Sequence, residues 1–269
     1  LYKGRGVEMT MLDCHIHIER GKYTMDWINQ FVQTAKERKL DEIWLLEHCY
    51  RFREFVSMYD DVCAYSDYID KWFHRKAGVL DLSDYLHLVE KVRQKDNGIK
   101  IKFGLEVCYF KEFENLVYQN TKDSGLDFLV GSVHFIDGFA YDHQPEHWQG
   151  VDVDKAYRRY FEISVDLANS SIYSGIAHPD CIKLFGHKPS FPLTEYYDQL
   201  ASALAENNMY AEQNSGSYRR FPETAELGMA EGLIKSLRSH NVKIQTASDA
   251  HCPEDVGLYI AELEKMATL

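Results

Sequence analysis

Short apolar runs alternate with longer amphipathic stretches along nearly the whole chain. Runs that are rich in β-branched and aromatic residues predict strands at 10–17, 42–48, 99–107, 127–134, 172–178, 208–213 and 242–249. Between them, apolar residues recur with a helical period at 25–39, 82–96, 152–169, 194–207 and 223–240. Strands that alternate with helices are typical of a mostly parallel sheet. Seven such strands favour an α/β fold whose sheet closes, or nearly closes, into a barrel.

The chain is predicted to form one domain over residues 1–269. It contains no low-complexity linker and no internal repeat, and α/β barrels of this size commonly form a single core. Residues 1–9 are interpreted as a disordered or peripheral leader. Residues 49–81 form a long insertion that is rich in aromatic residues. This insertion is either a helical excursion with a small core of its own or a cover over a substrate site.

The charge balance argues against some partners. A net charge of −12 and a pI near 5.4 disfavour a non-specific grip on nucleic acid, but they allow an anionic small substrate if metals reverse the local field. No apolar run approaches the roughly 20 residues of a membrane span. The six cysteines have no regular spacing and no signal-peptide pattern precedes them, which favours free thiols in the cytoplasm.

Histidines and carboxylates collect at the ends of the predicted strands. His15 and His17, in "LDCHIHIER", alternate along the first strand, so both side chains share a face. Taken alone, this pair fits an exposed polar face as well as half of a metal site. The other strand ends carry His48, Glu106, His134, His178, Asp249 and His251. The carboxyl ends of parallel barrel strands open on one rim, where active sites lie.

Together these eight side chains predict a metal cluster, although any one histidine could be an ordinary core residue. Imidazoles and carboxylates that converge from several strands would be destabilised unless a cation lay between them. Eight N and O donors suit Zn, Mn or Fe, and one metal rarely takes more than about six protein ligands, so we expect two or three divalent metals. Outside this set, His143 and His147 in "YDHQPEHWQG" are candidates for contact with a substrate.

The ordered motifs "HIH", "LEH", "GLEV", "SVHF", "IAHPD" and "SDAH" resemble the PHP (polymerase and histidinol phosphatase) superfamily. Within it, "GSVHFIDG" and "GIAHPDCIKLF" are similar to the monofunctional histidinol-phosphate phosphatases. The resemblance covers residues 11–252 and implies a distorted (β/α)7 TIM-like barrel with a trinuclear metal centre. It assigns one metal to His15, His17, Glu106 and Asp249, a second to Glu106, His134 and His178, and a third to His48 and His251.

The resemblance also leaves one ligand of the third metal open. The family usually has a His or Asp shortly after H-x-H, and the candidates here are Glu19 and Tyr23. Glu19 is favoured because a carboxylate is the better ligand at neutral pH. Glu47 is expected to orient the ligand His48, which follows it in the sequence.

Two arginine-containing segments are candidates for binding phosphate, because a guanidinium can donate two parallel hydrogen bonds to it. The family places one arginine in each. In "EQNSGSYRRF" the resemblance favours Arg219, and in "YRRYFE" it leaves Arg158 and Arg159 equally eligible. The alternative for this second segment is a solvated helix face.

The resemblance and the donor set together imply metal-assisted hydrolysis of a phosphomonoester, with L-histidinol phosphate as the expected substrate. Asp249 or His251 would handle protons, although both are also expected metal ligands. Alternatives are a PHP phosphoesterase that acts on another small ester, such as a sugar phosphate or nucleotide, and a non-catalytic PHP module stabilised by metals. A metal-dependent amidohydrolase is disfavoured, because it usually bridges its metals with a carboxylated lysine rather than a residue such as Glu106.

Overall fold

Seven parallel strands form the centre of the fold. In this computed structural model, which describes residues 10–268, the strands pair in sequence order from β1 to β7. They are Leu12–His17 (β1), Glu42–His48 (β2), Lys100–Cys108 (β3), Phe128–Ser132 (β4), Gly175–Ile176 (β5), Tyr210–Asn214 (β6) and Ile244–Ala247 (β7). The predicted leader at 1–9 lies outside the described residues.

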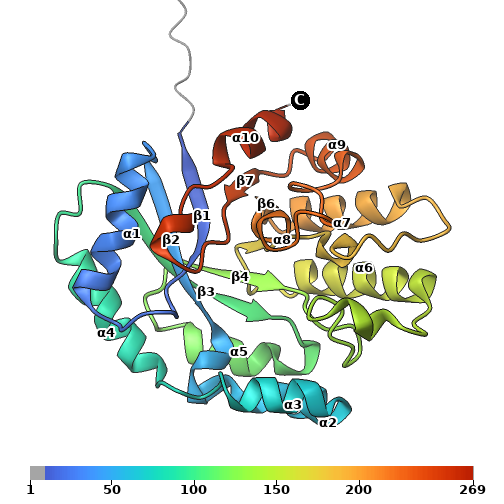
Figure 1. The fold of residues 1–269 in the computed structure, drawn as a ribbon, viewed down its shortest axis with the longest axis horizontal. Helices are drawn as coiled ribbons and strands as arrows, with labels where there is room; N and C mark the ends of the chain where they lie inside the picture. The colour runs from blue at the N-terminus through green and yellow to red at the C-terminus, as the bar shows by residue number, and fades with distance from the viewer. Residues whose placement is uncertain (1–9, 269) are drawn as a thin grey trace, which may run out of the picture.

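Helices surround the strands. Those that match predicted helices are Met25–Glu37 (α1), Leu82–Arg93 (α4), Val153–Asn169 (α6), Thr194–Glu206 (α7) and Glu231–Ser239 (α9). The others are Asp60–Tyr65 (α2), Asp67–His74 (α3), Glu114–Thr121 (α5), Gly216–Arg220 (α8) and Ile260–Thr268 (α10). Figure 1 shows α1 and α4 on one side of the strands and α6, α7 and α9 on the other. Within residues 10–268, no helix is both long and apolar enough to cross a bilayer.

The first and last strands nearly close the barrel. Ile16 and Ala250 form a parallel bridge, and the backbone N–H of His17 donates to the carbonyl of Ala250 at 2.7 Å. At the start of β1, the hydroxyl of Thr246 donates to the carbonyl of Leu12 at 2.6 Å. The parallel strand order and this contact between the edges confirm the predicted (β/α)7 TIM-like barrel.

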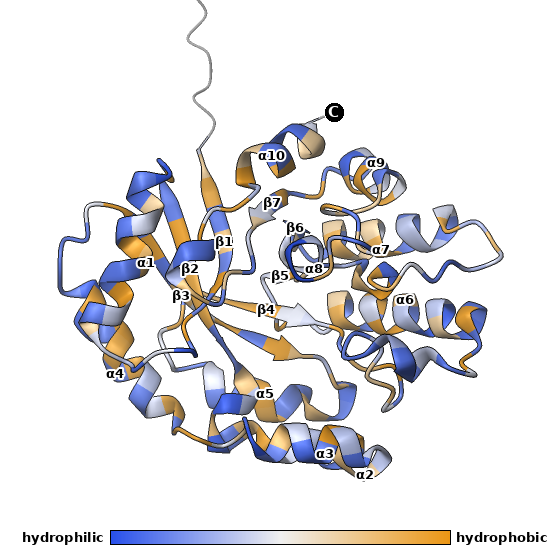
Figure 2. Cartoon of the chain, in the orientation of Figure 1, coloured by the Kyte–Doolittle hydropathy of each residue, from blue (hydrophilic) through white to orange (hydrophobic). Residues whose placement is uncertain are grey.

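Apolar side chains fill both the interior of the barrel and the layer between strands and helices. Figure 2 shows hydrophobic residues concentrated along the strands and on the helix faces that meet them. Within the barrel, a small buried cluster draws residues from five strands and from the turn after β5: Cys14, Trp44, Leu46, Phe128, Val130, Ala177, Tyr210 and Ala247. These packed apolar side chains form a rigid plug inside the barrel, and the polar residues lie above it at the carboxyl ends of the strands.

A bulge in β1 explains how the adjacent residues Cys14 and His15 can both be buried inside the barrel. Asp13 pairs with Ile43, but Ile16 pairs with Leu45, so β1 contains one extra residue between these pairs. Such a bulge re-aims the side chains that follow it. Cys14 therefore belongs to the buried cluster, while His15 contacts the other donors of the rim.

Two segments differ from the prediction. The strand predicted at 172–178 contracts to the two residues of β5, and the helix predicted at 223–240 begins only at Glu231. In the second case, the N–H of Met229 donates to the side chain of Gln213 at 2.5 Å and that of Ala230 to Asp180 at 2.7 Å, so these groups are held outside a helix. The insertion at 49–81 contains 3₁₀ turns followed by α2 and α3.

Asp13 ties the two edges of the barrel together, and its loss should destabilise the fold. Its buried carboxylate accepts from the N–H groups of Ser248 at 2.8 Å and Gly257 at 2.7 Å. Leaving both donors unpaired costs about 1–3 kcal/mol each. Burial also raises the pKa of Asp13 to about 6, so removing the charge recovers part of that cost. We expect Asp13→Ala to lower the free energy of unfolding by about 2 kcal/mol.

Urea unfolding followed by circular dichroism measures this change, with Asp123→Ala as the exposed control. The control should change stability by less than about 0.5 kcal/mol. Equal effects of the two substitutions would show that the bonds made by Asp13 do not stabilise the closure.

Candidate metal centre and cavity

The structure brings all eight donors from the strand ends into one cluster. Each member has a nitrogen or oxygen atom within 4.0 Å of another member, although the residues come from six strands or the turns that follow them. His15 Nε2 and His17 Nε2 are 2.9 Å apart. The contact between β1 and β7 adds Asp249, whose Oδ1 lies 3.7 Å from His17 Nε2.

Glu106 lies at the centre of the cluster and faces histidines with both carboxylate oxygens. Its Oε1 is 3.0 Å from His134 Nε2 and 3.2 Å from His178 Nε2. Its Oε2 is 2.7 Å from His48 Nδ1 and 3.4 Å from His17 Nε2. Each oxygen thus belongs to a different group of histidines, which is the arrangement needed for a carboxylate that bridges two metals.

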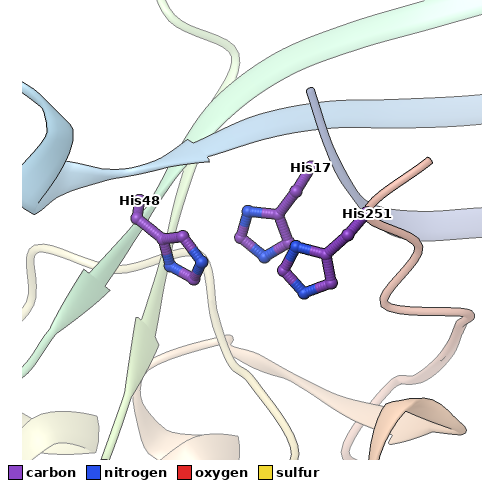
Figure 3. A group of neighbouring side chains, drawn as sticks. All are labelled: His17, His48 and His251. Carbon is purple, nitrogen blue, oxygen red and sulfur yellow. The ribbon is translucent and has the colours of Figure 1, made fainter. Parts of the chain in front are cut away.

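Three imidazoles form a stack at one end of the cluster. His17 lies between His48 and His251, with ring centroids 4.0 Å and 4.4 Å away. Figure 3 shows the three rings side by side, each carried by a different part of the chain. Three protonated rings could not be stacked this closely at acceptable cost, so most of these rings must be neutral, and each neutral ring offers one nitrogen lone pair.

The electrostatics of the cluster favour ionised carboxylates and a neutral His17. Burial lowers the pKa of His17, and the neighbouring His48 and His251 lower it further. Burial would raise the pKa of Glu106, but the charge of His48 and hydrogen bonds from the surrounding histidines hold it well below its ordinary value. Burial likewise opposes ionisation of Asp249, whose pKa nearby histidines keep low. These are the protonation states in which such side chains bind metals.

Two of the clustered residues have strained backbones. His178 has φ of 31° and Asp249 has φ of 55°, a region that non-glycine residues rarely adopt. Opposite Asp249, Gly216 leaves space for the carboxylate, because a Cβ at this position would overlap it. Strain of this kind persists where the surrounding structure fixes a side chain for function.

Divalent cations fit this donor set. The facing nitrogens of His15 and His17 can share at most one proton, so without a cation or a proton their lone pairs repel each other. Among the described residues, His17 Nδ1 and His178 Nδ1 are buried nitrogens without a hydrogen-bond partner. Buried imidazoles in such a state are typical of metal ligands.

Two buried carboxylates, which we did not predict from the sequence, hold histidines of the cluster from behind. Glu212 on β6 accepts from His15 Nδ1 at 2.9 Å, and Asp142 accepts from His134 Nδ1 at 2.7 Å. Burial by itself lowers the pKa of His15, but Glu212 and Asp249 raise it to about 10. Burial opposes ionisation of Asp142, yet His134 lowers its pKa to about 2. Both carboxylates fix the ring that presents its other nitrogen to the cluster.

Glu212 could have been identified from the sequence, whereas Asp142 could not. Glu212 is a charged residue in an otherwise buried strand, "MYAEQN", and this conflict of polarity could have marked it. Asp142 lies in an irregular loop after β4, and no periodicity indicates which way its side chain points.

Glu19 and Glu47 form an acidic pair beside the stacked histidines. Glu19 accepts from His251 Nδ1 at 2.7 Å, and each glutamate has an oxygen that can approach His17 within 4.8 Å. Glu47 accepts from the hydroxyl of Tyr23 at 2.5 Å and forms no hydrogen bond with His48 among the described residues, because adjacent strand residues face opposite ways. Burial and the charge of Glu19 raise the pKa of Glu47 to about 8.

The structure places Arg158 and Arg159 away from the cluster. Helix α6 packs on the barrel through a face that includes Tyr157, Tyr160 and Phe161, so the two arginines point outwards. Arg158 stacks on Phe191 and donates to the hydroxyl of Tyr196 at 2.6 Å. Arg159 pairs with Asp137 and Glu162. The interpretation of this segment as a phosphate-binding site therefore finds no support in the geometry.

Arg219 and Arg220 do reach the cluster, through the cavity above it. Arg219 is held by the carboxylate of Asp255 and donates to the carbonyl of Asp249 at 2.6 Å, while its Nε–H has no partner among the described residues. Arg220 stacks on Phe221 at 4.9 Å, and the structure pairs it with none of the carboxylates in residues 10–268. Both arginines thus line the cavity, as do Arg20, Arg51 and Lys76.

The cavity has a volume of about 650 Å³, which is within the range of small-molecule sites. Its floor contains donors of the cluster, including His48, Glu106, His134, His178 and His251. The insertion at 49–81 supplies a wall that includes Tyr50, Tyr59, Tyr68 and Trp72. A metal cluster at the base of a cavity with cationic and aromatic walls is suited to a phosphorylated organic molecule.

Comparison with known proteins gives the family. The family model for the PHP domain matches residues 13–216, and the chain belongs to the PHP domain family. It is 26% identical over 188 residues to a protein of Deinococcus radiodurans named "Probable histidinol-phosphatase", which covers 68% of this chain and 70% of that protein. A histidinol-phosphatase of Lactococcus lactis is 25% identical over 181 residues, covering 66% of this chain and 60% of that protein.

A solved structure shows the same fold. The crystal structure of histidinol phosphate phosphatase from Lactococcus lactis, in complex with zinc, L-histidinol and phosphate, matches with a TM-score of 0.69 and 21% identity. The match covers 96% of this chain and 93% of that chain. The distorted barrel is therefore common to both proteins.

Metal content provides a test of the cluster. Glu106→Ala removes the carboxylate that both groups of histidines share, so we expect metal affinity to fall by more than about 100-fold while the barrel remains folded. Elemental analysis after dialysis measures the metal, and far-ultraviolet circular dichroism measures the fold. The exposed Glu112→Ala is the control. Wild-type metal content in Glu106→Ala would rule out the cluster as the main metal site.

Proposed function

We propose that this protein is a metal-dependent phosphomonoesterase that hydrolyses L-histidinol phosphate to L-histidinol and phosphate. The observation that carries the proposal is the position of Glu106, whose two oxygens face separate groups of histidines beneath a cavity lined by arginines. The names of the relatives from Deinococcus radiodurans and Lactococcus lactis support the choice of substrate, as does the L-histidinol bound in the solved structure from Lactococcus lactis.

The cluster would hold two or three divalent ions, with Zn, Mn and Fe all suited to N and O donors. We assign the first to His15, His17, Glu106 and Asp249, the second to Glu106, His134 and His178, and the third to Glu19, His48 and His251. Metals bound there would supply Lewis-acid charge to the phosphoryl group and lower the pKa of a bound water. Zinc in the related solved structure favours that metal.

The arginines would neutralise the phosphoryl oxygens. Asp255 and the carbonyl of Asp249 fix the position of Arg219, so it offers a preorganised charge at low entropic cost. Arg220 has no such restraint within residues 10–268 and can approach the ester as it binds. Arg219, which the sequence also favoured, and Arg220 are therefore our candidates for binding phosphate, in place of Arg158 and Arg159.

Proton transfer to the leaving alkoxide falls to Asp249 or His251 in this proposal. Burial by itself lowers the pKa of His251, but hydrogen bonds with Asp249 and Glu19 raise it to about 9. A protonated His251 could donate to the leaving oxygen only while it holds no metal, because ligation requires the neutral ring. The two roles thus exclude each other at any one moment.

The context of the reaction is also part of the proposal. We place the enzyme in histidine biosynthesis in the cytoplasm, acting on a small phosphorylated substrate rather than on nucleic acid. All six cysteines are free thiols in the structure, which agrees with a reducing compartment. The acidic composition agrees with a substrate that is bound locally by metals and arginines rather than along a basic track.

A substrate panel tests the assignment. We expect kcat/KM for L-histidinol phosphate to exceed that for glycerol 3-phosphate and a nucleoside monophosphate by at least about 100-fold, because a site built to hydrogen-bond one leaving group rejects alcohols that lack its polar groups. Phosphate release from the metal-loaded enzyme is the measurement. Equal and slow hydrolysis of all esters would be consistent with a phosphomonoesterase but would rule out L-histidinol phosphate as its specific substrate. No phosphate release from any ester would favour a non-catalytic module.

The arginines provide a second test. We expect Arg219→Ala and Arg220→Ala each to lower kcat/KM by about 10- to 100-fold, which corresponds to one charge-assisted hydrogen bond. Arg158→Ala, whose guanidinium stacks on Phe191 outside the cavity, should change it by less than about twofold. Metal content should stay constant in all three. A large loss of kcat/KM in Arg158→Ala would instead support the interpretation from the sequence that this arginine binds phosphate.

A further inference from the structure

Two carboxylates beside the stacked histidines each have one engaged oxygen and one free oxygen. Glu19 accepts from His251 with Oε1 at 2.7 Å, and Glu47 accepts from the hydroxyl of Tyr23 with Oε1 at 2.5 Å. The Oε2 atoms of both glutamates are buried and have no hydrogen-bond partner among residues 10–268. We call Glu19 and Glu47 the acidic pair. Buried acceptors of this kind need a donor or a cation.

The acidic pair and His17 have the spacing of metal ligands. Glu19, Glu47 and His17 each offer one nitrogen or oxygen atom that lies within 4.8 Å of those of the other two. Ligand atoms lie about 2.0 to 2.5 Å from a divalent cation, so two ligands of one ion are at most about 5 Å apart. His17 forms a second such group with His48 and His251. The acidic pair therefore adjoins the stacked rings of Figure 3 and could share one ion.

Among the described residues, no cationic side chain pairs closely with the free oxygens of the acidic pair. Arg20 is 60% exposed, and its Nε lies 3.8 Å from Oε1 of Glu19, the oxygen that is already engaged. Arg51 acts on Glu47 only from a distance, since the two form no ion pair in the part of the chain that the structure describes. Two adjacent buried carboxylates cannot both stay ionised without a counter-charge. The acidic pair therefore holds either a cation or a shared proton.

An ion can reach the acidic pair from the cavity. Glu19 lines the cavity together with His48 and His251, and its side chain is 12% exposed. Glu47 is fully buried, and the hydroxyl of Tyr23 fixes its Oε1. The site thus combines an entrance at Glu19 with a preorganised ligand at Glu47, which lowers the entropic cost of binding.

The acidic pair gives this end of the cluster a different chemistry from the rest. The ion assigned to Glu106, His134 and His178 has one carboxylate and two imidazoles, whereas the acidic pair supplies two carboxylates. Carboxylate oxygens suit Mn²⁺ and Mg²⁺, and imidazoles suit Zn²⁺. Most sites bind Zn²⁺ more tightly than Mn²⁺, so a second carboxylate reduces this advantage of Zn²⁺ at one site.

We propose that Glu19 and Glu47 together bind the third ion of the cluster, next to His48 and His251, and make this the site that takes a hard divalent cation such as Mn²⁺. This inference rests on the metal assignment in the proposed function and deepens it by adding Glu47 as a ligand. Tyr23 orients that ligand through the other carboxylate oxygen. When both metals are supplied, Zn²⁺ fills the sites rich in histidine and Mn²⁺ fills the acidic pair.

Binding of Mn²⁺ to protein that already contains Zn²⁺ tests the site without any substrate. Metal-free protein is loaded with about two equivalents of Zn²⁺ and then titrated with Mn²⁺, and electron paramagnetic resonance measures free Mn²⁺. We expect the wild type to bind about one equivalent of Mn²⁺. Glu47→Gln keeps the shape of the side chain and an acceptor for Tyr23, so it should weaken Mn²⁺ binding by more than about 100-fold and retain the Zn²⁺. The exposed Glu112→Gln is the matched control.

Two further variants distinguish a ligand from a residue with a structural role. Tyr23→Phe removes the group that orients Glu47 but leaves the carboxylate, so Mn²⁺ binding should weaken by only about tenfold. Glu19→His replaces a carboxylate with an imidazole, so the ratio of Zn²⁺ to Mn²⁺ affinity at the third site should rise by at least about tenfold. Circular dichroism checks that each variant is folded.

The outcomes separate this inference from the proposed function. If the wild type binds no Mn²⁺ beside Zn²⁺, or if Glu47→Gln binds it as tightly as the wild type, the acidic pair shares a proton and the inference is wrong. Loss of Zn²⁺ together with Mn²⁺ in Glu47→Gln would also overturn it, because Glu47 would then support the whole cluster. These results leave the phosphatase assignment untouched, and failure to hydrolyse L-histidinol phosphate would leave the Mn²⁺ titration unchanged.

Discussion

The carboxylate of Glu106 is the constraint on which the rest of the site depends. It is almost fully buried and touches histidines on both sides. A buried charge is tolerated only when it is paired and hydrogen-bonded. Histidines can pair with it if they are protonated, but a stack of three rings cannot all carry charge. Divalent ions would resolve this conflict, because they would neutralise Glu106 and leave the imidazoles neutral.

The barrel provides the geometry that this constraint requires. Seven parallel strands deliver their carboxyl ends to one rim, so ligands that are distant in sequence converge without long loops. Packing alone would not hold them in place, since imidazole rings rotate. Glu212 and Asp142 fix two of the rings by hydrogen bonds, and the backbone at His178 and Asp249 accepts strain to direct two more side chains. The rigid plug of apolar residues below keeps the rim from collapsing.

Much of this arrangement could be predicted from the sequence because periodicity carries it. The two-residue period of a strand places His15 and His17 on one face, and the position of each donor at a strand end places it on the rim. The bulge in β1 could not be predicted, since it depends on pairing with β2. Asp142 lies in a loop whose path only the tertiary structure fixes. The outward direction of Arg158 and Arg159 could not be predicted, because the motif showed a basic segment but not which face of α6 packs on the barrel.

The distribution of the donors also determines when the metals can bind. The first pair, His15 and His17, is on β1, and the last pair, Asp249 and His251, follows β7. The two pairs come together only when the edges of the barrel meet. A growing or unfolded chain therefore contains no complete site, and metal loading must follow closure of the barrel. Ions bound there would contact both ends of the chain and would therefore add to the stability of the closed barrel.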